Sequence, residues 1–441
     1  MMKNKKSETF ISASSFIAAL IIIAILMVLS YLATVFVPCE GIPFWKWLLS
    51  PILVLGSEDK VTLIGVILFL LIIGGAFNAL TNCGVMRYMI DKIAGKYGES
   101  KYKLMGVIMF FFMALGSLIG SFEEVVPMVP IVVALSIRLG WDALTGVTMS
   151  LLAVGCGFAA GVFNPFTVGI CQEIAGLPMF SGAWFRAIGF VFIYILLYLF
   201  TRAHGMKIDR GTVEQGEEFV KDTKKDRGVL AFAVIMVTGI AIVLSTAFLT
   251  FLRDYSFVIV SVMFLIAGVT ACLVSGMDKK EFLSSFGKGI VSMLPAVLMI
   301  LMASSIKFTL QTAGVLEVII NAAISAASSL PRWAIILFIY LLVLVMNFFI
   351  ASGSAKAMML TPMLVPLGAA FGIPAQLVIV AFAFGDGFSN AFYPTNPALL
   401  ISLGLADTSY ADWFKHSGKF QLANLLLTSL LLLLGLAIGL Q

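Results

Sequence analysis

The most informative part of the sequence is Ala383-Phe-Gly-Asp-Gly-Phe-Ser-Asn-Ala-Phe-Tyr-Pro-Thr-Asn-Pro397. It continues an apolar segment, yet its glycines and prolines interrupt the hydrogen-bond ladder of a helix. It also holds an acidic residue, Asp386, and several polar side chains. Irregular backbone at membrane depth is tolerated only where protein or water covers it. The stretch therefore predicts a helix that breaks inside a membrane, beside a site that uses its polar groups.

The composition of the whole chain suits lipid. Of its 441 residues, 61% are hydrophobic and 12% are charged, about half of the ~25% charged residues typical of soluble domains. A membrane helix needs ~20 mostly apolar residues. The predicted spans are 13–37, 60–80, 142–163, 182–201, 229–251, 255–275, 291–312, 375–393 and 418–440. We therefore expect an all-α polytopic membrane protein.

Two longer apolar stretches, 103–139 and 331–371, behave differently from the spans. Small, polar and charged residues interrupt them at 116–124 and at 352–356. Because such backbone needs cover, we predict that both are re-entrant hairpins, which enter and leave the membrane on the same side. With this topology, the loops that are rich in Lys and Arg all lie on the same side of the membrane, as the positive-inside rule requires. This topology places the N-terminus inside the cell and the C-terminus outside.

An internal repeat appears when the sequence is shifted by 232 positions (164 + 232 = 396). The Asn-Pro pair at 164–165 then meets the pair at 396–397, and Gly140 meets Gly372. An odd number of crossings separates the two copies, so the second copy is inverted, an architecture typical of alternating-access transporters. The counterpart of the opening stretch, 151–165, is rich in glycine, and close helix packing is an equal alternative to binding there.

The repeat divides the chain into three parts. Residues 1–201 form the first repeat, with its broken helix over 142–177. The charged segment 202–228 is read as a cytoplasmic linker, with regulation as the alternative. Residues 229–441 hold a connecting span and the second, inverted repeat, with its broken helix over 375–405.

Charged residues at membrane depth mark the predicted site, because burying an ionisable group in lipid is costly and such groups face a cavity or a partner. Glu123 and Glu124 at the first hairpin tip could hold an ammonium or guanidinium group, or one could carry a coupling proton. Lys356 at the second tip could hold a carboxylate, or the acids and this base could simply pin the hairpins together. Lys307, near one end of its span, is expected to extend to the membrane surface.

The predicted substrate-binding residues are Ser121, Glu123, Glu124, Asn164, Ser352, Gly353, Ser354, Lys356, Asp386, Ser389, Asn390, Thr395 and Asn396. Three of them, Asn164, Asp386 and Asn396, are also candidates to coordinate a cation. The expected coupling ion is H⁺ or Na⁺, and no other cofactor is predicted.

Known catalytic and nucleotide-binding motifs do not occur in the sequence. It holds no GxxxxGK[ST] phosphate loop, no HExxH, and no Ser-His-Asp arrangement. Its five cysteines form no CxxC pair and give no zinc or disulfide signal, and its two histidines predict no metal site. No continuous polar pore with rings of charge is visible. We therefore expect a secondary transporter rather than an enzyme or a channel, with no nucleic-acid partner.

The sequence resembles the YfcC-like family of bacterial transporters over roughly residues 60–420. The motifs that carry the resemblance are Gly120-Ser-Phe-Glu-Glu124, Gly140-Trp-Asp-Ala-Leu-Thr145, Asn164-Pro-Phe-Thr-Val-Gly169, Ser352-Gly-Ser-Ala-Lys356, Phe384-Gly-Asp-Gly387 and Pro394-Thr-Asn-Pro397. The family belongs to the ion transporter superfamily, with C4-dicarboxylate carriers and basic amino-acid exchangers as relatives. It implies a scaffold plus a transport domain that moves like an elevator, and often a homodimer in the cytoplasmic membrane. The Asn-Pro turns replace the Ser-Asn-Thr turns of sodium-coupled cousins, which puts a sodium requirement in question.

Residues and resemblance together favour a carrier for a small charged organic solute in the bacterial cytoplasmic (inner) membrane. The leading interpretation is a cationic amino acid such as arginine, ornithine or lysine, moved by exchange or ion coupling. The alternative is a C4-dicarboxylate or short-chain carboxylate, with Lys356 as its anchor and Glu123 or Glu124 holding the coupling ion.

Overall fold

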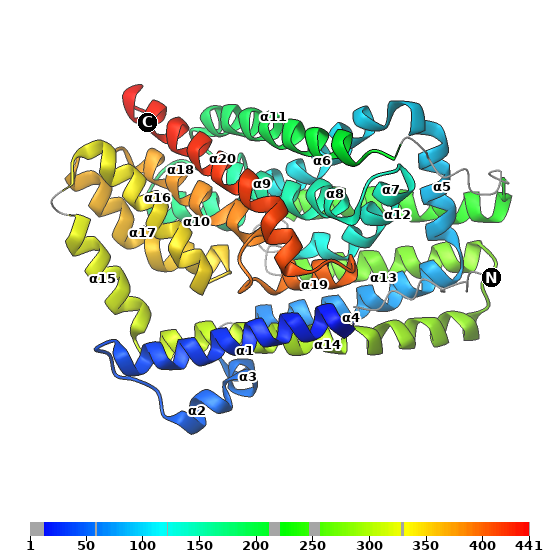
Figure 1. The fold of residues 1–441 in the computed structure, drawn as a ribbon, viewed down its shortest axis with the longest axis horizontal. Coiled ribbons are helices and arrows are strands. Elements are labelled where there is room, and N and C mark those ends of the chain that lie inside the picture. Colours follow the sequence, from blue (N-terminus) through cyan, green and yellow to red (C-terminus); the bar gives the residue numbers. More distant parts are fainter. Residues whose placement is uncertain are drawn as a thin grey trace.

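The computed structural model describes residues 13–57, 60–120, 122–210, 221–246, 256–327 and 330–440. Every regular element in these ranges is a helix, and seven helical segments among them are long and apolar enough to cross a membrane. The expected all-α membrane class is therefore confirmed. The helices form two layers joined by shorter connectors (Figure 1).

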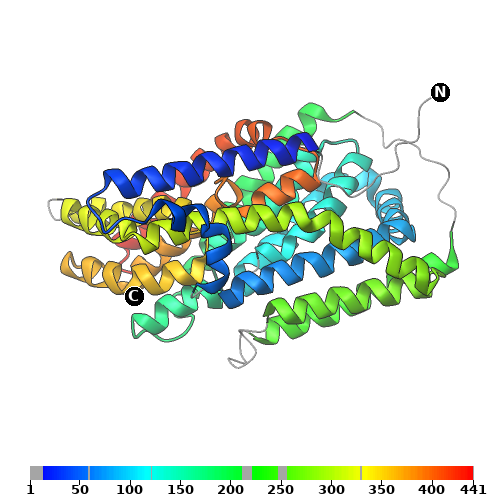
Figure 2. The ribbon, with the colours of Figure 1, turned by 90° about the horizontal axis from the view of Figure 1, so that it is seen from below.

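The lower layer in Figure 1 is a row of long helices that pack side by side. It consists of α1 (Ala13–Phe36), α4 (Lys60–Asn82), α13 (Ser256–Val274) and α14 (Lys279–Thr312), with α12 (Thr223–Thr246) packed on α13. In Figure 2, where the molecule is seen from below, α1 and α14 run alongside each other. Glycines allow α4 and α14 to approach closely: a Cβ at Gly289 would lie 2.3 Å from the carbonyl oxygen of Gly74. Small residues are the usual means of such packing in lipid.

The upper layer holds the remaining long helices and both broken segments. It consists of α6 (Lys101–Ile119), α7 (Val129–Arg138), α8 (Ala143–Val147), α9 (Ala153–Ala160), α10 (Ile170–Ile174), α11 (Ala183–Ile208), α16 (Arg332–Phe349), α17 (Gly353–Ala370), α18 (Ala375–Gly387), α19 (Pro397–Leu405) and α20 (Tyr410–Ala437). The segment Ala143–Ile174 is 94% buried in its most apolar window, so the first broken helix lies in the protein core and not against lipid.

Short helices complete the chain. The connectors are α2 (Phe44–Leu48), α3 (Ser50–Leu53), α5 (Val85–Tyr97) and α15 (Val315–Ala327), and the single turns are η1 (Val54–Gly56), η2 (Gly98–Ser100), η3 (Glu123–Met128), η4 (Thr148–Leu152), η5 (Pro165–Gly169) and η7 (Phe388–Ala391). Helix α5 links α4 to α6, and α15 links α14 to α16, so each connects the lower layer to a hairpin. Both follow a glycine with φ of +76°, Gly84 and Gly314, a conformation that side chains rarely adopt.

Both interrupted stretches form two consecutive helices, α6 and α7 in the first and α16 and α17 in the second. Lys101 at the start of α6 donates to the carbonyl of Leu139, just after α7, at 3.2 Å. Arg332 at the start of α16 donates to the carbonyl of Gly372, just after α17, at 2.7 Å. The two ends of each pair therefore meet, as a hairpin requires. The re-entrant position of the hairpins in a membrane stays a prediction.

The two halves share local geometry at the positions that the shift of 232 aligns. Asn164 and Asn396 each have an extended backbone and each cap the turn that follows, with proline next in the chain. Gly140 and Gly372 both have positive φ, +89° and +68°. In Figure 1, α16 and α17 lie towards one end of the long axis and α5 and α7 towards the other. The inverted relation of the copies stays a prediction.

Several helices extend beyond the predicted spans. Helix α14 begins at Lys279, twelve residues before the predicted 291, and α20 begins at Tyr410 instead of 418. In both cases the added turns carry charged residues, which hydropathy assigns to loops although the helix continues through them. The linker predicted over 202–228 is shorter than expected, because residues 202–208 continue α11 and residues 223–228 begin α12; residues 211–220 lie outside the described residues.

The ends of that linker lie beside the basic segment that follows α4. Lys101 forms an ion pair with Asp209 at 2.7 Å, and Lys92 pairs with Asp226. Two loops that the positive-inside rule assigns to the cytoplasm therefore meet at the same end of the molecule. Which side of the membrane this end faces stays a prediction.

Candidate functional site

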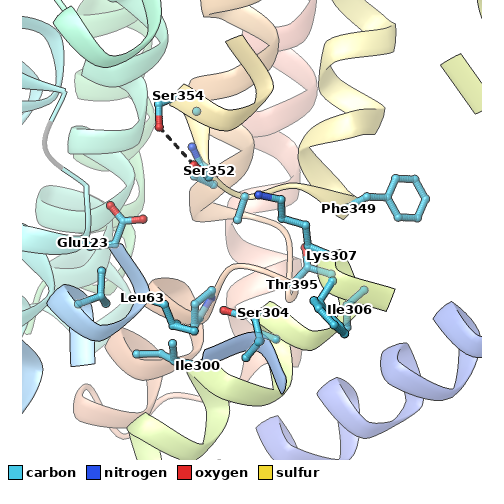
Figure 3. A pocket seen from close by; sticks show the side chains of 18 of the residues that line it. Leu63, Glu123, Ile300, Ser304, Ile306, Lys307, Phe349, Ser352, Ser354 and Thr395 are labelled. Atoms are coloured by element: carbon cyan, nitrogen blue, oxygen red, sulfur yellow. Dashed lines mark hydrogen bonds between the residues drawn. The ribbon is translucent and has the colours of Figure 1, made fainter. Parts of the chain in front are cut away.

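A cavity of about 510 Å³ opens between the two layers. The lower layer contributes one face of α14, from Ile300 to Thr312, and parts of α4 and η1. The upper layer contributes both hairpin tips and the break after α18 (Figure 3). The volume falls within the ~300–1,000 Å³ of ordinary small-molecule sites. Two layers, both hairpin tips and the break after α18 thus converge on one site.

Two charged side chains line this cavity from different layers. Glu123 begins η3 at the first hairpin tip, where it is half-buried. Lys307 projects from α14 of the lower layer. Figure 3 shows them on different walls, with Ser352 and Ser354 above. The site therefore offers one acid and one base at separate places.

Hydroxyl and amide groups complete the polar lining. Ser352 caps the start of α17 and lies 3.4 Å from Ser354, oxygen to oxygen. Asn390 and Thr395 come from the break between α18 and α19. The Thr395 hydroxyl is buried and has no hydrogen-bond partner among the described residues, so it is available to a ligand. Aromatic and aliphatic residues form the rest of the wall: Phe122, Phe158, Phe166, Ile300 and Phe349.

The predicted binding residues divide into two groups. Those that line the cavity are Glu123, Ser352, Gly353, Ser354, Asn390 and Thr395. Those that lie behind its wall are Asn164, Lys356, Asp386, Ser389 and Asn396. Ser121 lies outside the described residues, as does the side chain of Glu124.

The second group is held in a buried network around Lys356 and Asp386. Both side chains are fully buried, and the Lys356 Nζ lies 2.5 Å from Asp386 Oδ1. The same ammonium donates to the Asn347 side chain and, at 2.7 Å, to the carbonyl of Ile350. A charge this deep needs such partners. Lys356 therefore contacts protein oxygens and does not line the cavity.

Asn347 is a member of this network that sequence reasoning missed. Its amide nitrogen donates to the Asp386 carbonyl at 2.9 Å, to Ser389 Oγ at 2.6 Å and to Asn390 Oδ1 at 3.1 Å. It therefore connects the second hairpin to the second broken helix. The available signal was a single polar residue in the apolar run before the break, which is costly to bury unless it is bonded.

Lys307 also differs from its prediction. It was expected to reach the membrane surface because it lies near one end of an apolar span. In the structure, Lys307 lines the cavity together with Ser304 and Gln311, which lie on the same face of α14. Residues three and four apart on a helix share a face, so a polar stripe at 304, 307 and 311 was the signal that could have found this wall.

The breaks in both helices free backbone carbonyls, and nearby side chains satisfy several of them. Arg186 is fully buried and donates to the carbonyls of Gly161 at 2.9 Å and Val162 at 3.0 Å. Trp413 donates to the carbonyl of Ala391 at 2.8 Å. These carbonyls therefore have partners within the protein. Arg186 and Trp413 stabilise the irregular backbone that shapes the site.

The glycines of the first broken helix serve close packing, one of the two alternatives left open by the sequence. A Cβ at Gly157 would lie 1.9 Å from the carbonyl oxygen of Met113 in α6. A Cβ at Gly387 in α18 would lie 2.0 Å from the backbone nitrogen of Ala159. Helices α6, α9 and α18 can therefore touch backbone to backbone directly behind the cavity.

Comparison with known proteins gives one family. The sequence model of the family described as "C4-dicarboxylate anaerobic carrier" (DcuC) matches residues 51–437. The chain is 28% identical over 377 residues to the "Putative basic amino acid antiporter YfcC" of Escherichia coli (strain K12), covering 80% of this chain and 74% of that protein. It is 23% identical over 397 residues to an uncharacterised protein of Haemophilus influenzae, covering 85% and 76%. The resemblance to the YfcC-like family is confirmed.

Among solved structures, the chain is similar to the YdaH transporter of Alcanivorax borkumensis, with 19% identity and a TM-score of 0.47 over 96% of this chain and 98% of that one. It is also similar to MtrF of Neisseria gonorrhoeae, described as one of a class of antimetabolite efflux pumps, with 13% identity and a TM-score of 0.44 over 95% and 94%.

Proposed function

Since the chain belongs to the C4-dicarboxylate anaerobic carrier family and is a membrane transporter, we propose that it carries an amino acid with a cationic side chain by alternating access. The single observation that carries this proposal is the pair of opposite charges, Glu123 and Lys307, on different walls of one cavity. A basic amino acid presents the complementary pair, a carboxylate and a cationic group at the far end of an apolar stem.

The lining supports a specific placement of such a solute. Lys307 faces the α-carboxylate, because an ammonium group on a partly buried wall binds an anion through charge-assisted hydrogen bonds. Glu123 receives the ammonium or guanidinium of the side chain. Phe166 and Ile300 offer apolar surface for the methylene groups, and the Thr395 hydroxyl offers one further polar partner. The printed name of the Escherichia coli relative, a basic amino acid antiporter, supports the same class.

The test compares Glu123→Gln with the wild type, using arginine and succinate as ligands. Removing one partner of a desolvated charge pair costs ~2–5 kcal/mol, so arginine affinity should fall at least about 30-fold. Succinate binding should not weaken, because glutamine removes a negative charge from its surroundings. Thermal shift of the purified protein and uptake into proteoliposomes measure both. Equal arginine affinity in the wild type and in Glu123→Gln would exclude the role given to Glu123.

A second candidate substrate is a C4-dicarboxylate or short-chain carboxylate. Lys307 and the start of α17, capped by Ser352, lie on the same cavity, and a helix N-terminus adds to the attraction of an anion. If this candidate is right, succinate stabilises the wild type and arginine does not. Lys307→Gln should then abolish the succinate response, while Glu123→Gln should leave it or strengthen it.

A further inference from the structure

The surroundings of the Lys356 ammonium are those of a bound cation. Its three contacts are oxygen atoms: a carboxylate oxygen of Asp386, the side-chain oxygen of Asn347 and the main-chain carbonyl of Ile350. They come from two different segments, the second hairpin and the second broken helix. The lysine side chain is fully buried, so these contacts replace its hydration shell.

Two of the three oxygens are held in place by the fold, those of Ile350 and Asn347. Ile350 follows the last turn of α16 with φ −127° and ψ 93°, so its carbonyl points out of the helix direction at the break. The two N–H groups of the Asn347 amide are shared among three acceptors from Asp386, Ser389 and Asn390, which orients the amide. Its oxygen must therefore face Lys356. These two oxygens are therefore positioned by the fold and not by the lysine alone.

The Asp386 carboxylate depends on that positive charge. Neither of its oxygens accepts a hydrogen bond within the described part of the chain, apart from the ion pair with Lys356. Its second oxygen lies against Gly353, where a Cβ would be only 2.6 Å away. Without a cation nearby, an ionised carboxylate at this depth would be severely destabilised. Carboxylate, amide and carbonyl oxygens are the ligands that hard cations prefer, and unwound backbone supplies them in transporters.

We propose that Lys356 fills a monovalent-cation site with its own ammonium, so that the carrier works without sodium, and that removing this side chain creates a sodium site. The inference deepens the proposed function and rests on it, because it names the coupling behaviour of the same carrier. If Lys356 and Asp386 formed only a structural ion pair, removing the Lys356 side chain would destabilise the protein equally in every salt.

The experiment measures thermal unfolding of purified protein in NaCl, KCl and choline chloride at equal ionic strength, with no organic solute present. The wild type should melt at the same temperature in all three. Lys356→Ala should melt lower in choline chloride and rise by roughly 2–5 °C in NaCl, with saturation, as expected for a ligand at ten to a hundred times its Kd. Adding Asp386→Asn to this variant should abolish the sodium response.

Lys307→Ala is the matched control, because it removes a lysine from the cavity and leaves the oxygen cage intact. It should show no response to sodium. A sodium response of equal size in Lys307→Ala would mean that any lost positive charge produces the effect, and would overturn the proposal. Identical melting of Lys356→Ala in sodium and choline would overturn it as well.

Two further outcomes decide the matter if the single variant is unstable. If Lys356→Ala cannot be purified even in sodium while Lys356→Ala/Asp386→Asn can, sodium does not replace the ammonium and the proposal fails. If neither variant folds, the wild type decides: specific stabilisation by sodium contradicts the proposal, and its absence supports it. Since no transported solute is used, a wrong substrate class leaves all of these results unchanged.

Discussion

Asn347 shows how one side chain can hold two segments together. Its amide connects the second hairpin with the break after α18 through bonds to Asp386, Ser389 and Asn390, and its oxygen accepts from Lys356. All of these partners are buried. Buried polar groups that lose their partner cost ~1–3 kcal/mol each, and charged ones more. The stability of the site therefore depends on this residue as much as on the charges.

We expect Asn347→Leu to destabilise the protein by about 3–5 kcal/mol, because it removes one of the three oxygens around a buried ammonium together with the hydrogen bonds to Asp386, Ser389 and Asn390. The matched control is Asn321→Leu, at an exposed position of α15, which should change stability by less than about 0.5 kcal/mol. Thermal or denaturant unfolding in detergent measures both. A loss in Asn347→Leu no larger than that in Asn321→Leu would show that the network adds little stability.

Gly353 offers a second test at a single residue. A Cβ there would lie 2.6 Å from Asp386 Oδ2 and 2.8 Å from Thr167 Cγ2, so Gly353→Ala should displace the hairpin tip. We expect a lower melting temperature and slower transport. Gly287→Ala in α14 meets nothing within 4 Å and should stabilise the helix by up to ~1 kcal/mol. If both variants behave alike, the tip has room to move and the close contact is not required.

The sequence predicted six residues that line the cavity, but it missed Asn347 and did not place Lys307 there. Asp386 and Lys356 are conspicuous because ionisable residues are rare in apolar segments. Asn347 is one polar residue in an apolar helix, and the neighbouring sequence does not indicate which way its side chain faces. The sequence also could not give the depth of Lys356 behind the wall, because that depends on how the hairpin packs against α18.

Helices α4 and α13 of the lower layer carry a cysteine pair that the spacing of cysteines in the sequence did not reveal. Cys83, just after α4, and Cys272, in α13, lie 3.4 Å apart, sulfur to sulfur. The hydrogen bond from the Cys272 thiol outweighs the opposing effect of burial and lowers the pKa of Cys83 to about 7. Because the thiolate is the reactive form, Cys83 should react readily near neutral pH.

We expect mild oxidation with copper phenanthroline to join Cys83 and Cys272 in a disulfide. Each thiol releases a proton to the solvent and gives one electron to Cu(II), which is reduced to Cu(I), and the two sulfurs form the S–S bond. The rate should rise as pH increases through about 7, because more Cys83 is then ionised. Both helices belong to the lower layer, so transport should survive the cross-link. Mass spectrometry of peptides detects the bond, and Cys272→Ser is the control that cannot form it.

The arrangement of elements was the most predictable level of the structure. Spans and hairpins follow from apolar runs of ~20 residues and from their interruptions. The contribution of α14 to the cavity was not predictable in the same way, since hydropathy places a helix in the membrane but does not give its rotation. Whether Lys307, Ser304 and Gln311 face the cavity or the lipid depends on that rotation.

At the scale of the whole molecule, the cavity lies between two layers that are connected through α5 and α15. We propose that access alternates because the upper layer moves past the lower one, which is the movement that the family resemblance implies. A small second cavity lies between the same layers, and both Leu70 of α4 and Val126 of η3 line it. A link between these two positions would tether the layers.

We expect Leu70→Cys/Val126→Cys, made in a Cys83→Ser/Cys272→Ser background, to lose transport when a short bifunctional thiol reagent with a reducible bond is added. Reduction of that bond should restore transport, and either single cysteine variant should be unaffected. The measurement is uptake into proteoliposomes before and after reduction. Full transport by the tethered protein would show that the layers do not move past each other here.

The two cavity charges belong to different layers, and this has an electrical consequence. Glu123 lies on the hairpin of the upper layer and Lys307 on α14 of the lower one, while the ion pair of Lys356 and Asp386 is neutral as a unit. If the upper layer moves, it takes the charge of Glu123 with it, at about 2.3 kcal/mol per charge for every 100 mV crossed. A basic amino acid in the cavity cancels that charge, so the loaded movement is insensitive to the membrane potential and the empty return is not. Exchange, in which both movements are loaded, should therefore proceed at the same rate under any imposed voltage, while net uptake should not.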